Sequence, residues 1–221
     1  MLQNKTMRQL LTLSIFFFTA SLALSATECI GPANAKKSIV YLHGMDTEFP
    51  SSQELGNRVV LSELAKKLNI RFALPRAKDK CPPSPQQVCW TWAAKTSADL
   101  ANVKTAIKSA ASDCFSNKDY SVLGFSNGGV AVTAMLRLCE KVDFKSAIVI
   151  GAAGGWFSTD PKNLKDCNPS LISLLGSKDT ANQKPVRDLI SHLISLKAPA
   201  VLVEYEGDHK LLYDPLANLL K

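Results

Sequence analysis

The chain has 221 residues, of which 46% are hydrophobic and 20% are charged, and its formal net charge is +7. This composition excludes a disordered chain, and the length fits one domain of roughly 100–200 residues behind an N-terminal leader. The lysines are spread along the chain without a basic run interleaved with aromatic residues. We therefore expect solvated surface charge and no nucleic-acid partner.

Residues 1–25 have the pattern of a cleaved signal peptide. Basic residues precede an apolar run over 10–24, and small residues up to Ala26 offer a signal-peptidase site. An uncleaved anchor is the alternative, but the run is shorter than the roughly 20 residues that span a bilayer. We predict a mature domain over residues 26–221 that is secreted or periplasmic and has no membrane span.

Beyond this leader, short apolar runs alternate with helical patterns, which is typical of parallel strands joined by crossover helices. The apolar runs are nearly continuous, as in strands that are covered on both faces. We predict a single-domain α/β fold with a mainly parallel sheet of about six strands, helices on both faces and ligands at the carboxyl ends of the strands. The predicted strands cover 38–44, 70–75, 120–125, 146–152, 171–177 and 200–206. The predicted helices include 61–68, 97–110 with Ser97 as N-cap, 127–140, 186–193 and 211–220.

The most informative motif is GFSNGG, residues 124–129, at the junction between the third predicted strand and the next helix. A chain that turns abruptly from a strand into a helix has a strained backbone, and side chains beside the turn would collide with the adjoining elements. Gly124 and Gly128 relieve that crowding and leave the hydroxyl of Ser126 exposed above the sheet. An ordinary glycine-rich turn is the alternative, but the position between strand and helix favours a nucleophile elbow.

A serine hydroxyl is a poor nucleophile unless a base removes its proton, so this motif requires a histidine within reach. The chain has 3 histidines. His43 ends the first predicted strand and is expected to shape that turn, while His192 lies in a helical pattern and is expected at the surface. His209 follows the last strand and is therefore the predicted general base.

The imidazole needs a carboxylate that holds its tautomer and stabilises the imidazolium. Asp179 follows the fifth predicted strand, and the order Ser126, Asp179, His209 is that of the α/β-hydrolases. Asp160, after the fourth strand, is the alternative because it faces the same edge. Asp208 adjoins His209, and neighbouring side chains rarely point at each other productively. We predict that Asp179 is the acid.

A tetrahedral intermediate carries a negative oxygen that needs two hydrogen-bond donors. One predicted donor is the main-chain N–H of Asn127, which follows the serine at a helix N-terminus. The other is the main-chain N–H of Met45, in the turn after the first strand. Because both donors are main-chain groups, we expect the identities of these two residues to be only lightly constrained.

Aromatic residues in two loops are candidates for a substrate pocket at the same edge. They follow the second and fourth predicted strands, and ordinary packing of loop aromatics is the alternative. The chain has no CxxC pair and no cysteine–histidine cluster, so we expect neither a metal nor an organic cofactor. The candidate pocket residues are Trp90, Trp92, Trp156 and Phe157.

The motifs YLHGM, CWTW, GFSNGG, GSKD and GDHK occur in this order. In them the sequence resembles the small secreted α/β-hydrolases of the polyhydroxybutyrate-depolymerase and feruloyl-esterase type, and more broadly the carboxylesterase and dienelactone-hydrolase-like group. The resemblance implies a serine esterase that cleaves carboxylic esters through an acyl-serine intermediate, with Ser126, Asp179 and His209 as the triad. The alternatives are a peptidase or thioesterase with the same triad, a non-catalytic binding protein on this fold, and a surface-interaction protein.

All 6 cysteines lie beyond the leader, and in an exported protein an even number favours disulfides. The resemblance implies that the helices ending near Cys114 and Cys139 pack side by side, so these two cysteines are expected to meet. Buried free thiols are the alternative for some of the six. The predicted bridges are Cys114–Cys139, Cys81–Cys89 across a proline-rich loop, and Cys29–Cys167 by default.

Overall fold

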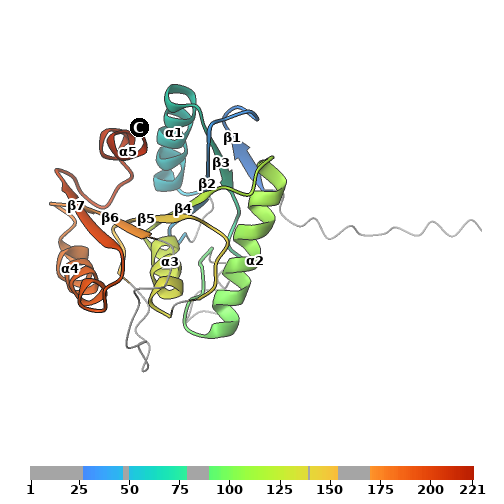
Figure 1. Ribbon diagram of the computed structural model, residues 1–221. Helices are drawn as coiled ribbons and strands as arrows, with labels where there is room; N and C mark the ends of the chain where they lie inside the picture. The colour runs from blue at the N-terminus through green and yellow to red at the C-terminus, as the bar shows by residue number, and fades with distance from the viewer. Residues whose placement is uncertain (1–26, 47–49, 79–89, 139, 154–169) are drawn as a thin grey trace, which may run out of the picture.

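A mainly parallel sheet forms the middle layer of the molecule (Figure 1). The computed structural model describes residues 27–46, 50–78, 90–138, 140–153 and 170–221. Within these residues the sheet has 7 strands in the order β1-β3-β2-β4-β5-β6-β7, and only β1 runs antiparallel to its neighbour. The strands are β1 (Glu28–Ile30), β2 (Lys37–Leu42), β3 (Ile70–Leu74), β4 (Ser121–Phe125), β5 (Ser146–Ile150), β6 (Ser170–Gly176) and β7 (Ala200–Tyr205).

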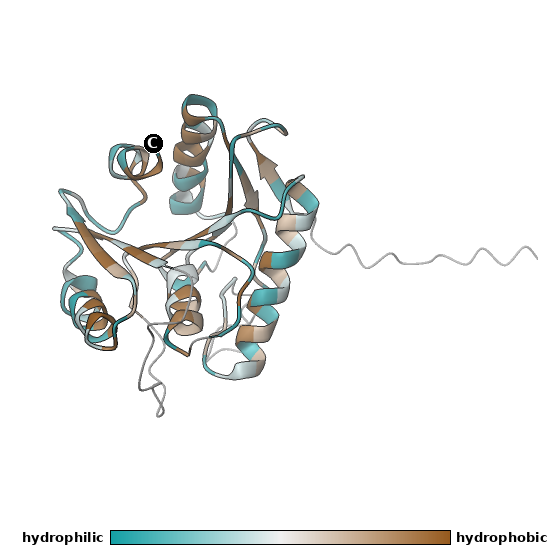
Figure 2. Ribbon diagram, viewed as in Figure 1, coloured by the Kyte–Doolittle hydropathy of each residue, from teal (hydrophilic) through white to brown (hydrophobic). Residues whose placement is uncertain are grey.

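Helices cover both faces of this sheet. Side chains of α1 and α5 pack in one hydrophobic cluster, and those of α2, α3 and α4 pack in another on the opposite face. Figure 2 shows apolar residues along the strands and on the helix sides that face them. The helices are α1 (Ser52–Leu68), α2 (Ser97–Cys114), α3 (Asn127–Arg137), α4 (Thr180–Ser195) and α5 (Tyr213–Leu220).

The predicted architecture is confirmed, but one strand was not predicted and one helix cap was assigned to the wrong residue. The sequence did not reveal β1, because a strand of 3 residues carries no usable alternation and forms only by pairing with β3. The N-cap of α2 is Thr96 rather than Ser97. The Thr96 hydroxyl accepts from the N–H of Asp99 at 3.1 Å, and the Asp99 carboxylate accepts from the N–H of Thr96 at 2.9 Å.

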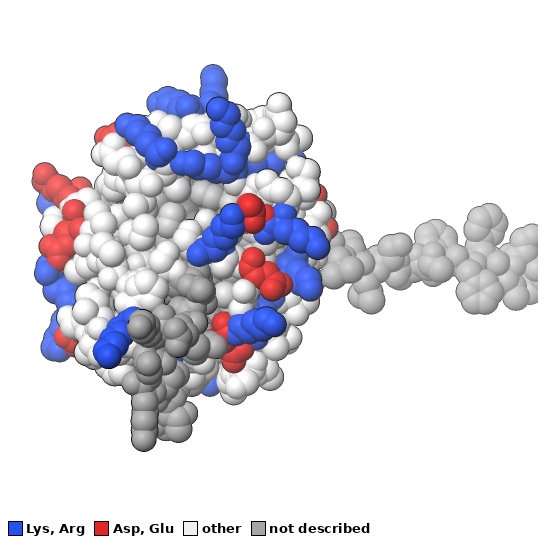
Figure 3. Space-filling model, viewed as in Figure 1, with Lys and Arg blue, Asp and Glu red and all other residues white. Residues whose placement is uncertain are grey.

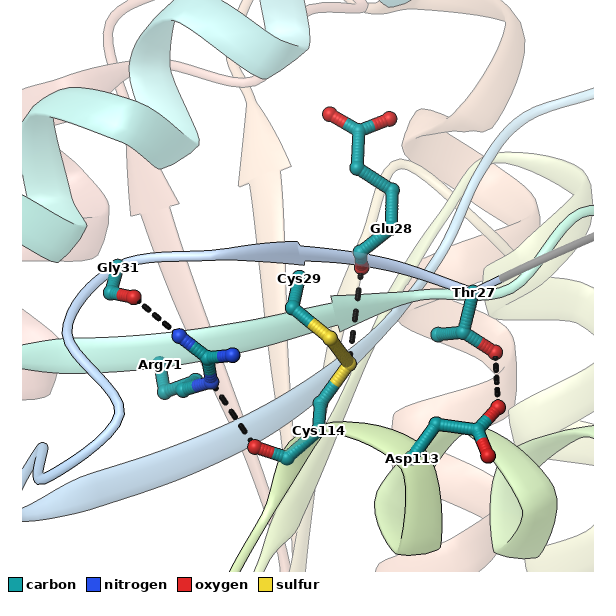
Figure 4. The surroundings of a disulfide bond; sticks show 7 residues. All are labelled: Thr27, Glu28, Cys29, Gly31, Arg71, Asp113 and Cys114. Carbon is teal, nitrogen blue, oxygen red and sulfur yellow. Dashed lines mark hydrogen bonds between the residues drawn. A yellow bond between two sulfur atoms is a disulfide. The ribbon is translucent and has the colours of Figure 1, made fainter.

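A disulfide joins Cys29 on β1 to Cys114 at the end of α2, with a Cα–Cα distance of 5.7 Å (Figure 4). The predicted bridges Cys114–Cys139 and Cys29–Cys167 are therefore wrong, since a cysteine forms one bridge. The physical reason is β1, which lies along β3 and carries Cys29 to the end of α2. Helices α2 and α3 do pack side by side, as expected. Cys81, Cys89, Cys139 and Cys167 lie outside the described residues.

Polar contacts reinforce the same junction between β1 and α2 (Figure 4). The guanidinium of Arg71 donates to the carbonyl oxygen of Cys114 at 2.9 Å and also to that of Gly31. The hydroxyl of Thr27 donates to the Asp113 carboxylate at 2.8 Å. The N-terminal strand is thus fixed by a covalent bond and by hydrogen bonds on both sides of it.

The surface in Figure 3 carries basic and acidic side chains near one another over several elements. Two exposed pairs are Lys145 with Asp119 at 2.8 Å and Lys178 with Glu206 at 3.2 Å. Exposed ion pairs of this kind contribute little to stability. In the described part of the chain, no helix is long and apolar enough to cross a membrane.

A buried acid lies where α1 starts against β2. Glu54 is 3% exposed, and its carboxylate accepts from the hydroxyl of Tyr41 at 2.9 Å and lies 3.4 Å from the Nε of Arg58. The side-chain amide of Asn57 donates to the Tyr41 hydroxyl at 3.0 Å. Burial raises the pKa of Glu54 from 4.5 to about 7, because the low-dielectric surroundings penalise the charged form.

Replacing this acid with Glu54→Gln is expected to change how stability depends on pH. The folded state holds the Glu54 proton more tightly than the unfolded state. The contribution of this proton to the free energy of unfolding is therefore fully present below pH 4.5 and is lost as the pH rises through about 7. The free energy of unfolding of wild type minus that of Glu54→Gln should fall across this window, by up to about 1.4 kcal/mol per pH unit. Urea denaturation of both proteins at a series of pH values measures this difference.

Glu63→Gln is the matched control, because Glu63 lies on the same helix but its side chain is 51% exposed and pairs with Lys67. It should keep the wild-type pH dependence. Equal slopes for wild type and Glu54→Gln would contradict the raised pKa.

Candidate active site

The turn from β4 into α3 holds Ser126 in an unusual backbone conformation. Its φ of 50° and ψ of −116° lie where residues other than glycine are strained. The main chain on both sides keeps it there: the N–H of Ser126 donates to the carbonyl of Ile150 at 3.0 Å, and its carbonyl accepts from the N–H of Val130 at 3.0 Å. Strain of this kind clusters at functional sites.

The glycines beside Ser126 are required by close backbone approach. A Cβ on Gly124 would lie 2.7 Å from the Cα of Gly129, and a Cβ on Gly128 would lie 2.2 Å from the carbonyl oxygen of Leu42. No side chain fits at such distances, so both positions need glycine. The crowding predicted from GFSNGG is confirmed.

His43 shapes the end of β2, as the sequence predicted. It is 1% exposed, its Nε2 accepts from the N–H of Ala77 at 3.0 Å, and its Nδ1 donates to the carbonyl of Gly44 at 2.6 Å. The carbonyl of His43 accepts from the N–H of Gly128 at 3.0 Å and from the indole N–H of Trp92 at 3.1 Å. Burial lowers the pKa of His43 to about 4, in keeping with a neutral ring.

Asp179 and His209 meet at the carboxyl ends of β6 and β7. The Nδ1 of His209 donates to Oδ2 of Asp179 at 2.7 Å. The Asp179 side chain is 4% exposed and that of His209 is 32% exposed. The side-chain amide of Asn182 donates to both oxygens of Asp179, at 2.9 and 3.1 Å. Sequence reasoning missed Asn182, although an asparagine in the first turn after the acid is a signal for such a contact.

Two contacts bring the His209 ring towards Ser126. The ring lies 5.0 Å, centroid to centroid, from that of Phe125, which directly precedes Ser126. It also packs over Gly151, where a Cβ would lie 2.6 Å from the His209 Nδ1. Gly151 follows Ile150, whose carbonyl binds the N–H of Ser126. The serine, the histidine and the aspartate therefore lie at one edge of the sheet, after the carboxyl ends of β4, β7 and β6.

The side chain of Asn127 is held in place by three hydrogen bonds. Its Oδ1 accepts from the N–H of Trp92 at 2.6 Å and from the hydroxyl of Thr91 at 2.9 Å, and its Nδ2 donates to the carbonyl of Trp92 at 3.3 Å. These partners belong to the segment after residue 89, which comes within reach only in the folded chain.

Comparison with solved structures decides the fold. The model superposes on a carboxylesterase from Mesorhizobium loti with a TM-score of 0.63 at 16% identity, covering 88% of this chain and 91% of that one. The Bacillus cereus carboxylesterase gives a TM-score of 0.62 at 13% identity, covering 89% and 92%. Acyl-protein thioesterase 2 from Zea mays gives a TM-score of 0.62 at 17% identity, covering 88% of this chain and 95% of that one. The chain has the α/β-hydrolase fold. Its sequence matches no protein-family model and no curated protein.

The loops after β2 and β3 are paired with each other. Asp46 and Trp90 exchange main-chain hydrogen bonds of 3.1 and 2.7 Å. The guanidinium of Arg76 lies 3.3 Å from the centroid of the Trp90 ring, and Met45, just before Asp46, is 62% exposed. Trp90 and Met45 therefore lie on paired loops that follow β3 and β2.

The other residues weighed from the sequence lie in different surroundings. Trp92 is 4% exposed and packs 5.3 Å from the His43 ring, which favours ordinary packing over a substrate contact. His192 is in the last turn of α4, whereas Asp179 precedes its first turn. Asp208 is paired with Lys210 at 2.8 Å. Asp160, Trp156 and Phe157 lie outside the described residues.

The arrangement of possible metal ligands among the described residues does not favour a metal site. Over the described ranges, no group of three or more histidine, cysteine, aspartate or glutamate side chains is arranged to hold a metal ion.

Proposed function

We propose that the protein is a serine hydrolase that cleaves carboxylic esters through an acyl-Ser126 intermediate. The observation that carries this proposal is the 2.7 Å hydrogen bond between His209 and Asp179 at the sheet edge where Ser126 is held in a strained turn. Because Nδ1 of His209 is occupied by Asp179, Nε2 is the nitrogen left to take the serine proton. The similarity of this fold to the folds of two carboxylesterases supports the same chemistry.

In this mechanism the Oγ of Ser126 attacks the ester carbonyl carbon while its proton passes to Nε2 of His209. The resulting oxyanion accepts hydrogen bonds from the main-chain N–H groups of Asn127 and Met45. The bond to the alcohol oxygen then breaks, and His209 returns the proton to the leaving alcohol. Water, deprotonated by His209, attacks the acyl-serine and releases the acid. The partial exposure of the His209 ring is compatible with entry of that water.

A thioester substrate is the second candidate, favoured by the likeness to an acyl-protein thioesterase. The same serine, base and oxyanion donors serve both reactions, since only the leaving group differs.

The proposal includes a secreted or periplasmic location, which the protein reaches through the predicted leader over 1–25. The Cys29–Cys114 disulfide supports this location.

Ser126 is expected to be the one serine that reacts stoichiometrically with an organophosphonate, because activation requires the elbow and a base together. Intact mass followed by peptide mapping measures the adduct. The same protein is then assayed on p-nitrophenyl esters of increasing chain length and on matched thioesters. Urea-unfolded protein is the control and should not be labelled. Labelling at another serine, or none in folded protein, would remove Ser126 from the proposed role.

A further inference from the structure

The side chain of Asn127 links the start of α3 to the segment of residues 90–92. Its three hydrogen bonds, at 2.6, 2.9 and 3.3 Å, engage the hydroxyl of Thr91 and both main-chain groups of Trp92. The amide side chain thus satisfies both the main-chain N–H and the carbonyl of Trp92. The position of the 90–92 segment therefore depends on the first residue of α3.

The 90–92 segment in turn holds the turn after β2. Trp90 pairs with Asp46 through two main-chain hydrogen bonds, and the indole N–H of Trp92 donates to the carbonyl of His43 at 3.1 Å. The turn is thereby fixed at both of its ends, His43 and Asp46. Between them lie only Gly44 and Met45, and the Gly44 carbonyl, which shares a planar peptide unit with the Met45 N–H, accepts from Nδ1 of His43 at 2.6 Å. The direction of the Met45 N–H therefore depends on this bond and on the two attachments.

We propose that the Asn127 side chain is a positioning group that couples the two halves of the oxyanion site, an inference that rests on the proposed function. One half is the main-chain N–H of Asn127 itself, and the other is the N–H of Met45. The link runs from the Asn127 amide through Trp92 and Trp90 to Asp46, next to Met45. A single residue therefore contributes one donor through its main chain and aligns the other through its side chain.

The geometry matters because both donors must point at one developing negative oxygen. Losing a donor of this kind lowers the rate by about 10²–10³-fold, and a displacement near 1 Å can cost about 10²-fold. Such an effect acts on the transition state, where the oxygen carries the charge, more than on substrate binding. Loosening the 44–46 turn should therefore lower kcat and leave KM nearly unchanged.

Asn127→Ala tests the link, since it removes the amide but keeps the main-chain N–H. Turnover of a p-nitrophenyl ester is expected to fall by about 10–10²-fold with KM changed less than about twofold. Hydrogen exchange should become faster at the amides of Asp46 and Trp90, which Asn127 does not touch, and stay unchanged in β5 and β6. Peptide-level exchange by mass spectrometry measures the second effect without any substrate.

Two further variants guard against a folding defect. Thr91→Val removes only the 2.9 Å hydroxyl contact and keeps the side-chain shape, so it should change both readouts in the same direction but less than Asn127→Ala. Asn117→Ala changes an exposed asparagine in the loop between α2 and β4 and should behave as wild type.

The outcomes separate this inference from the proposed function. Wild type that neither hydrolyses esters nor reacts with a phosphonate overturns the proposed function, while hydrogen exchange still decides whether the link exists. Unchanged exchange at Asp46 and Trp90 in Asn127→Ala overturns the link. Faster exchange with wild-type kcat overturns its role in positioning the oxyanion donor.

Discussion

Asp179→Asn is expected to lower turnover by about 10⁴-fold while the protein stays folded. The carboxylate now accepts the Nδ1–H of His209 at 2.7 Å, which leaves Nε2 free of a proton. An amide nitrogen facing Nδ1 would donate instead and favour the tautomer that carries its proton on Nε2, which cannot accept one from Ser126. The Asn182 amide can still donate to the remaining side-chain oxygen, so the local packing should survive.

Steady-state hydrolysis of a p-nitrophenyl ester gives the turnover of this variant, and far-UV circular dichroism with a thermal melt reports its folding. Asp208→Asn is the matched control, because Asp208 is next to His209 in the chain but its side chain is paired with Lys210. Asp160→Asn should also be mild. A severe loss in Asp160→Asn together with a mild one in Asp179→Asn would transfer the role of the acid to Asp160.

Removing the disulfide with the double variant Cys29→Ala/Cys114→Ala is expected to lower the free energy of unfolding by about 4 kcal/mol. The bridge spans 85 residues of sequence, so its loss releases a large loop in the unfolded chain. Turnover should be retained, because strands β3 and β2 separate β1 from β4, the strand that leads into Ser126. Urea denaturation under non-reducing conditions measures the loss.

Thr27→Ala is the control for this junction, since it removes only the 2.8 Å hydrogen bond to Asp113 and should cost about 1 kcal/mol or less. Non-reducing peptide mapping of wild type checks the covalent bond itself. A peptide that joins Cys114 to a partner other than Cys29, or a double variant as stable as Thr27→Ala, would refute this account of the junction.

The candidate site shows where sequence reasoning reaches its limit. Ser126, Asp179 and His209 follow predicted strands, and parallel strands bring their carboxyl ends to one edge, so their convergence was predictable. The side chain of Asn127 was not assigned a task, because its partners Thr91 and Trp92 lie far from it in the sequence. The contact of Asn182 with Asp179, only three residues away, was missed although the sequence offers a local signal for it. Glu54 was not singled out from the sequence, because its contact with Tyr41 on β2 forms only in the folded chain.

The sequence by itself determined the order of strands and helices, the two-sided sheet and the glycine-lined turn around Ser126. These features depend on periodicity and on backbone sterics, which act between residues close together in the chain. Only the tertiary structure decided the β1 pairing, the Cys29–Cys114 bridge and the link from Asn127 to Asp46. Each of these joins segments far apart in the sequence, and a short strand, a cysteine or an amide carries no local signal of the partner that folding will bring to it.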